Sequence, residues 1–206
     1  LLKLFGLSID NGEMDRPLIG CISRLSDQKG FDLIFDIIGR VLDRGALLVL
    51  LGSGAEYYER AFRAMAETHP SQVGVYLGYS NELAHKIEAG ADMFLMPSRF
   101  EPCGLNQMYS LKYGTVPIVR AAGGLDDTIE PFNRMTGQGN GFKFVEYTSA
   151  RLLEKIYEAL LVYTDGPIWR RLMLNGMSND FSWTMSARRY VEVYENVAQS
   201  RLAALA

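Results

Sequence analysis

The chain has 206 residues, of which 48% are hydrophobic and 22% are charged, and these values are typical of a globular protein rather than a disordered or fibrous one. Its formal net charge of −3 excludes the basic excess that drives non-specific binding to nucleic acids or to acidic membrane surfaces. The two cysteines, Cys21 and Cys103, form no CxxC pair and lie apart from both histidines, so neither a disulfide framework nor a zinc site is expected.

Five short apolar runs along the chain are typical of strands that are buried on both faces of a parallel sheet. Between them, helical patterns cover residues 31–42, 55–69, 81–90 and 105–113. This alternation predicts an α/β fold, a Rossmann-like doubly wound parallel sheet with helices on both faces. The runs are Leu18–Ile22, Ala46–Leu51, Val73–Leu77, Met93–Met96 and Val116–Val119.

The chain changes character after Val119, where a glycine-rich stretch leads to Gly141–Val145, a short strand or loop that we expect to return to the sheet. The remainder reads as helical. With no internal repeat, linker or second hydrophobic core, the sequence indicates a single domain over residues 1–206. Near its end, apolar residues at helical spacing form one face: Ala187, Tyr190, Val191, Tyr194, Val197 and Ala198.

The segment after the first predicted strand, residues 22–31, carries two cations, Arg24 and Lys29, in a loop that opens a helix. In open parallel sheets ligands bind beyond the carboxyl ends of the strands, which is where this loop falls. Lysine is favoured at helix C-termini, so Lys29 before a helix N-terminus indicates an anion nearby. The alternative is a pair of solvated surface cations.

The segment after the fourth predicted strand, residues 97–107, is also unusual. Gly104 at the start of the next helix lets backbone N–H groups approach a phosphate closely. Glu101 places a carboxylate at the same edge of the predicted sheet as Lys29. The alternative for Glu101 is an acid that complements the helix dipole. Cys103 is better explained by packing than by reactivity, because no histidine is near it in sequence.

Other nucleotide motifs are incomplete. Residues 52–57 contain Gly-x-Gly after a strand but lack the third glycine and the later acid of a dinucleotide site. The chain has no GxxxxGK[ST] segment, which excludes a P-loop ATPase, and no Asp-x-Asp, which removes support for a metal-dependent sugar-nucleotide site of that kind.

Three segments, residues 22–30, 97–105 and 123–128, occur in an order that resembles bacterial glycogen synthases and plant starch synthases. The resemblance continues through residues 140–142 and 181–183 to Tyr194, so it covers nearly the whole chain. It implies the GT-B fold, two Rossmann-like domains facing across a cleft, of which this chain resembles the C-terminal, donor-binding one. The family's N-terminal acceptor domain, with its Lys-x-Gly-Gly-Leu motif, is absent from the chain, and residues 183–200 are expected to form a cross-over helix.

The resemblance also implies a reaction, the transfer of glucose from ADP-glucose to the non-reducing end of an α-1,4-glucan, with retention and with no metal or cofactor. Arg24 and Lys29 fall where the family neutralises the donor diphosphate, and Glu101 falls where it holds the glucosyl hydroxyls. Tyr79 falls where an aromatic ring stacks on the adenine. The segment whose backbone meets sugar and phosphate corresponds to Cys103, Gly104, Leu105 and Asn106.

The chain departs from related families at one position. Many retaining GT-B enzymes have a second glutamate eight residues after the first, and here that position is Tyr109, which puts a ribose–carboxylate contact in question. Asn106 stands where some members have threonine, an exchange that preserves a hydrogen bond to phosphate.

Two other functions remain open at the level of sequence: a non-catalytic nucleotide- or glucan-binding module on the same fold, and another GT-B transferase that uses UDP-glucose. The presence of Arg24, Lys29 and Glu101 favours an enzyme over a non-catalytic binding module. The expected partners are a nucleotide-sugar donor, a glucan acceptor and the N-terminal domain of the same enzyme, without nucleic acid or membrane. No signal pattern or membrane-spanning run is visible, so we expect a cytoplasmic protein, or a stromal one in a plant.

Overall fold

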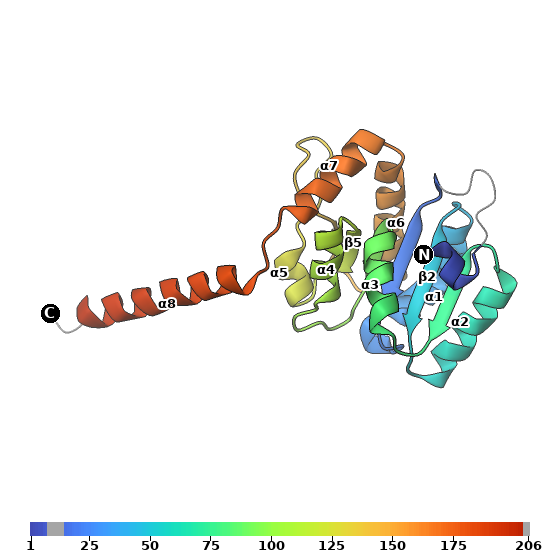
Figure 1. Ribbon diagram of the computed structural model, residues 1–206, viewed down its shortest axis with the longest axis horizontal. Coiled ribbons are helices and arrows are strands. Elements are labelled where there is room, and N and C mark those ends of the chain that lie inside the picture. The colour runs from blue at the N-terminus through green and yellow to red at the C-terminus, as the bar shows by residue number, and fades with distance from the viewer. Residues whose placement is uncertain (8–14, 204–206) are drawn as a thin grey trace.

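A single six-stranded sheet organises the computed structural model, which describes residues 1–7 and 15–203 (Figure 1). All neighbouring strands are parallel, and their order is β3-β2-β1-β4-β5-β6. The order reverses between β1 and β4, so the sheet is doubly wound, as the sequence predicts. The strands are β1 (Leu18–Ile22), β2 (Leu47–Gly52), β3 (Val73–Leu77), β4 (Met93–Met96), β5 (Val116–Arg120) and β6 (Phe142–Phe144).

Helices cover both faces of the sheet, and each face has its own apolar cluster. One cluster contains residues of the helices α1 (Phe31–Leu42), α2 (Glu56–Thr68), α6 (Ser149–Tyr163) and α7 (Gly166–Met177). The other contains residues of α3 (Asn81–Gly90), α4 (Asn106–Tyr113) and α5 (Gly124–Thr128), together with residues around the 3-10 helix η1 (Leu2–Phe5).

The central strands are the ones with uninterrupted apolar sequence. Every residue of β2 and β4 is buried, because each strand has a neighbour on both sides and helices above and below. The edge strand β3 is only partly buried. All five predicted strands are confirmed to within one residue at each end, and the segment Gly141–Val145 does return to the sheet as β6.

The short helix α5 has no counterpart among the periodic patterns of the sequence. It lies in the glycine-rich stretch, where Leu125 is its one large buried side chain. A Cβ atom at Gly124 would come within 2.0 Å of the carbonyl oxygen of Cys103, so this glycine serves close packing against the loop before α4. Close backbone packing of this kind leaves no hydrophobic period in the sequence.

The last helix, α8 (Trp183–Ala203), projects from the body of the molecule (Figure 1). It is the helix expected over residues 183–200. Its apolar face is exposed along its length, including Tyr190, Val191, Tyr194 and Val197. Within the described part of the chain, nothing covers this face.

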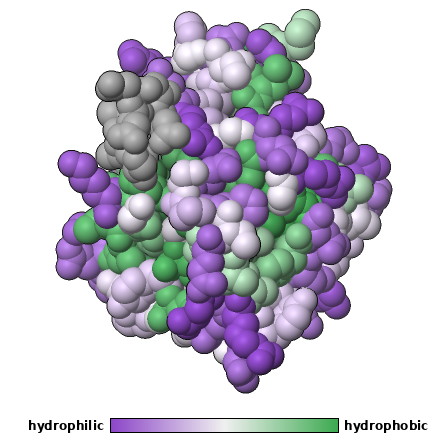
Figure 2. Space-filling view, turned by 90° about the vertical axis from the view of Figure 1, so that its right-hand side faces the viewer, coloured by the Kyte–Doolittle hydropathy of each residue, from purple (hydrophilic) through white to green (hydrophobic). Residues whose placement is uncertain are grey.

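The surface of the rest of the molecule is more hydrophilic than the exposed face of α8. Figure 2, which views the right-hand side of Figure 1, shows hydrophilic residues over most of that face with hydrophobic residues scattered between them. Scattered apolar residues are normal on a water-facing surface. None of the helices described by the structure has the length and apolarity needed to cross a lipid bilayer.

Candidate active site

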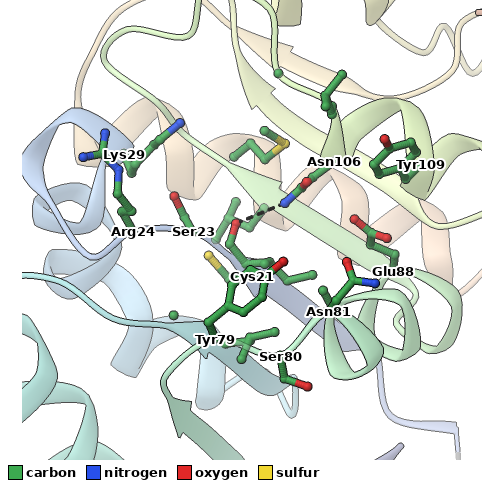
Figure 3. Close-up of a pocket in the computed structure, with 18 of the residues that line it drawn as sticks. Cys21, Ser23, Arg24, Lys29, Tyr79, Ser80, Asn81, Glu88, Asn106 and Tyr109 are labelled. Atoms are coloured by element: carbon green, nitrogen blue, oxygen red, sulfur yellow. Dashed lines mark hydrogen bonds between the residues drawn. The ribbon is translucent and has the colours of Figure 1, made fainter.

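A cavity of about 500 Å³ opens at the carboxyl ends of β1 and β4, at the point where the strand order reverses (Figure 3). Its walls come from the loops after β1, β2, β3 and β4 and from the helices α3 and α4. This is the place where open parallel sheets bind their ligands. Among the predicted site residues it brings together Arg24, Lys29, Tyr79, Glu101, Gly104, Leu105 and Asn106.

Backbone contacts hold the loop after β1 against the loop after β4. The main-chain N–H of Arg99 donates to the carbonyl of Gln28 at 2.9 Å. Gly30 has φ +79°, and a Cβ atom there would lie 2.2 Å from the carbonyl oxygen of Pro97, so only glycine fits. The loop that carries Lys29 and the loop that carries Glu101 therefore form one unit.

Lys29 and Glu101 form the central charged pair of the cavity. Nζ of Lys29 lies 2.6 Å from Oε2 of Glu101, and the hydroxyl of Ser98 donates to the same oxygen at 3.1 Å. The side chains are only 19% and 9% exposed. The anion that the sequence predicts beside Lys29 is thus supplied by the protein itself, 72 residues along the chain.

Two polar groups of the cavity, one on Glu101 and one on Arg24, remain available to a ligand. Oε1 of Glu101 accepts no hydrogen bond from any described residue. The exposed side chain of Arg24 lines the same cavity, and no described residue pairs with its guanidinium group. The arrangement offers one uncompensated cation for a phosphate and one carboxylate oxygen for a hydroxyl.

The loop before α4 is shaped by Gly104 and Gln107. Gly104 has φ +70°, and a Cβ atom there would lie 2.6 Å from Oε1 of Gln107. The fully buried Gln107 donates from Nε2 to the carbonyls of Cys103 and Gly104 and to the hydroxyl of Thr128. The first N–H groups of α4 lack partners within the helix and carry its positive dipole end, which suits an anion.

The remaining predicted site residues differ in how far they are buried in the cavity. Asn106 donates from Nδ2 to the carbonyl of Ile22 at 3.4 Å, which ties α4 to the end of β1 (Figure 3). Tyr79, directly after β3, is 86% exposed at the rim, and Leu105 is also exposed. Cys103 is exposed but does not line the cavity.

Sequence reasoning missed the wall that α3 contributes. Asn81, His85 and Glu88 line the cavity, and Tyr109 of α4 lies beside them, with its ring centroid 6.0 Å from that of His85. Nδ1 of His85 lies 3.0 Å from Oε2 of Glu88. Burial raises the pKa of the Glu88 carboxyl above its usual value, and the neighbouring His85 partly offsets this. A glutamate on the buried side of a helix was the available signal.

A second missed feature lies outside the cavity and holds its loops. Two guanidinium groups lie near the ring of Tyr147, with Arg99 at 4.5 Å and Arg120 at 5.4 Å from its centroid. Its hydroxyl donates to Oδ1 of Asp32 at 2.5 Å, and Arg120 donates to the carbonyl of Arg99 at 2.9 Å. We refer to these four residues as the Tyr147 clamp, because it joins the start of α1 to the loop that carries Glu101.

A switch-point cavity with cations, a buried carboxylate and a helix N-terminus is typical of nucleotide-binding α/β domains. Residues 9–163 match the family described as Glycosyl transferases group 1, and the chain belongs to that family. It is 52% identical over 98% of its length to a glycogen synthase from Koribacter versatilis and 48% identical over 97% of its length to one from Kosmotoga olearia. The chain spans 41% of the length of each.

Among solved structures, the chain is similar to the catalytic domain of starch synthase IV from Arabidopsis thaliana bound to ADP and acarbose. The TM-score is 0.84 with 40% sequence identity, and the match covers 94% of this chain and 40% of that one. The similarity to glycogen and starch synthases and to the C-terminal half of the GT-B fold is therefore confirmed. The role of each site residue stays a prediction.

Proposed function

We propose that this chain is the donor-binding part of a glucosyltransferase that moves glucose from ADP-glucose to the non-reducing end of an α-1,4-glucan with retention of configuration. The observation that carries the proposal is the Lys29–Glu101 pair, with Arg24 beside it, in the switch-point cavity. The identity to glycogen synthases supports the substrate class, as does the starch synthase that binds ADP and acarbose.

Each site residue has a distinct task in this reaction. Negative charge grows on the phosphate oxygen as the glucosyl bond breaks, so Lys29, Arg24 and the N-terminus of α4 stabilise the leaving group. Glu101 uses its free Oε1 to hold glucosyl hydroxyls, and its bond to Lys29 couples sugar position to phosphate position. Tyr79 offers its exposed ring to the adenine.

The remaining partners belong to the rest of the enzyme. We assign the acceptor glucan to an N-terminal domain of the same protein, and the exposed face of α8 to contact with that domain. Residues 1–206 then act as one domain with no metal or cofactor of their own. The reaction takes place in the cytoplasm, or in the stroma if the source is a plant.

Binding to the 206-residue chain tests the proposal. By titration calorimetry we expect ADP and ADP-glucose to bind and UDP and UDP-glucose to bind more weakly. Lys29→Ala should weaken ADP binding about 10-fold or more, since a charge-assisted hydrogen bond is worth about 1.5–3 kcal/mol. Arg40→Ala on the outer face of α1 is the control. Equal binding of the uridine ligands would favour the UDP-glucose alternative, and no nucleotide binding would refute the proposal.

An activity measurement tests the division of labour. Because acceptor and donor must be held together for transfer, the chain alone should not elongate a glucan. Glucan elongation by the purified chain would contradict the assignment of the acceptor to another domain.

A further inference from the structure

One face of α3 forms the wall of the cavity that lies away from the cations. Asn81, His85 and Glu88 are spaced i, i+4 and i+7, which places them on one side of the helix. Figure 3 shows Glu88 and Tyr109 on one side of the cavity and Arg24 and Lys29 on the other. A ligand whose phosphates meet the cations would present another of its parts to this wall.

The Glu88 carboxylate is unusual for its burial and its partners. The side chain is 2% exposed, and it still lines the cavity. Oε2 is within hydrogen-bond distance of Nδ1 of His85, whereas Oε1 accepts no hydrogen bond from any described residue. Glu88 therefore presents to the cavity an oxygen that can accept a further hydrogen bond.

The helix holds this carboxylate in place. Oγ1 of Thr115 lies within hydrogen-bond distance of the main-chain carbonyl oxygens of Glu88 and Ala91, at 2.6 and 2.8 Å, and its one proton can serve either. This fixes the end of α3 against the start of β5. His85 restrains the carboxylate from the solvent side, so Glu88 has a fixed position from which to accept hydrogen bonds.

The chemistry of the wall selects its ligand group. An ionised carboxylate repels phosphate because both groups are negatively charged. It can only accept hydrogen bonds, so it binds groups that carry O–H or N–H donors. In a nucleoside diphosphate these donors are the two vicinal hydroxyls of the pentose and the amine of the base. The pentose lies between diphosphate and base, and the base is assigned to Tyr79 at the rim. A buried acceptor deeper in the cavity therefore matches the pentose.

We propose that Glu88, held by His85, is a binding residue for the vicinal ribose hydroxyls of the donor nucleotide. This inference rests on the proposed function, because it requires a nucleoside diphosphate in the cavity. It gives the site a carboxylate for the ribose from α3, whereas the corresponding position on α4 holds Tyr109.

The test compares ADP with 2′-deoxy-ADP, 3′-deoxy-ADP and IDP by titration calorimetry on the 206-residue chain. Each deoxy analogue should bind about 5- to 10-fold more weakly than ADP, because one hydrogen bond to the carboxylate is lost. Glu88→Gln should weaken ADP binding by a similar factor and weaken the deoxy analogues less, because each analogue has already lost one of the two hydrogen bonds to the carboxylate. The control is Glu82→Gln on the exposed side of the same helix, which should change nothing.

The outcomes separate this inference from the function on which it rests. No binding of ADP to the unmodified chain would overturn both. If ADP binds and the deoxy analogues bind equally well, the ribose contact alone is overturned. A loss confined to IDP would place the carboxylate at the base amine and also overturn it. Equal weakening of all four ligands by Glu88→Gln would show a structural role for Glu88 and refute the inference.

Discussion

Replacing Glu101 with glutamine should strengthen the binding of ADP while it impairs transfer. Glu101 neutralises Lys29 across 2.6 Å. When ADP enters, its phosphate must share Lys29 with this carboxylate and is repelled by it. Glu101→Gln keeps the shape and the Ser98 contact but removes the negative charge. The free cation then attracts the diphosphate more strongly.

The size of this effect follows from the geometry of the pair. If Lys29 contacts both groups, with a phosphate oxygen at about 2.8 Å, the phosphate and carboxylate oxygens lie at most about 5.4 Å apart. Their repulsion is then about 0.8 kcal/mol at the dielectric constant of water and about 3 kcal/mol at an effective value of about 20. Since the cavity is open to water, we expect ADP to bind about 10-fold more tightly.

Titration calorimetry on the chain at two salt concentrations measures the effect, and added salt should reduce it. The matched control is Glu158→Gln, because Lys155 and Glu158 have the same 2.6 Å separation on α6, away from the cavity. The free energy of unfolding should fall by about 1.5–3 kcal/mol in Glu101→Gln, which loses a charged hydrogen bond. Unchanged or weaker ADP binding by a folded Glu101→Gln chain would refute the reasoning.

Three further predictions follow from other features. Gly104→Ala should weaken ADP binding about 10-fold and lower the melting temperature, because the added methyl group strains a φ of +70° and collides with Gln107; unchanged values would contradict this. A thiol reagent at pH 8 should label Cys103 and spare Cys21, whose pKa burial raises to about 12; mass spectrometry decides. The exposed apolar face of α8 should make the isolated chain self-associate, and deleting residues 183–206 should abolish this and leave the melting temperature of the body unchanged, as sedimentation and calorimetry can show.

The fold and the centre of the site could be predicted from the sequence for a common physical reason. Strands buried on both faces need continuous apolar runs, and the segments that follow them reach the same edge of the sheet. Arg24, Lys29 and Glu101 follow two such runs, β1 and β4, which pair directly in the structure. Their convergence on one cavity follows from the strand order.

The α3 wall could not be predicted in this way. The helical pattern puts Glu88 on the buried side of α3, but its place at the cavity depends on how α3 packs against β1 and Thr115, which no local pattern shows. A Cβ atom at Gly20 of β1 would lie 2.6 Å from Ile87, so the glycine allows α3 to sit close to the sheet. Only this close packing brings Glu88 to the cavity.

The Tyr147 clamp explains why the Lys29–Glu101 pair has a defined geometry. Lys29 and Glu101 lie on loops, which are the most mobile parts of a fold unless other contacts restrain them. Here Tyr147 bonds to Asp32 at the start of α1 and stacks on Arg99, two residues before Glu101. Restraint of both segments by the same side chain favours the 2.6 Å contact between Lys29 and Glu101. In the proposed reaction, charges held in this way need no reorganisation as the leaving group develops, which would lower the barrier to transfer.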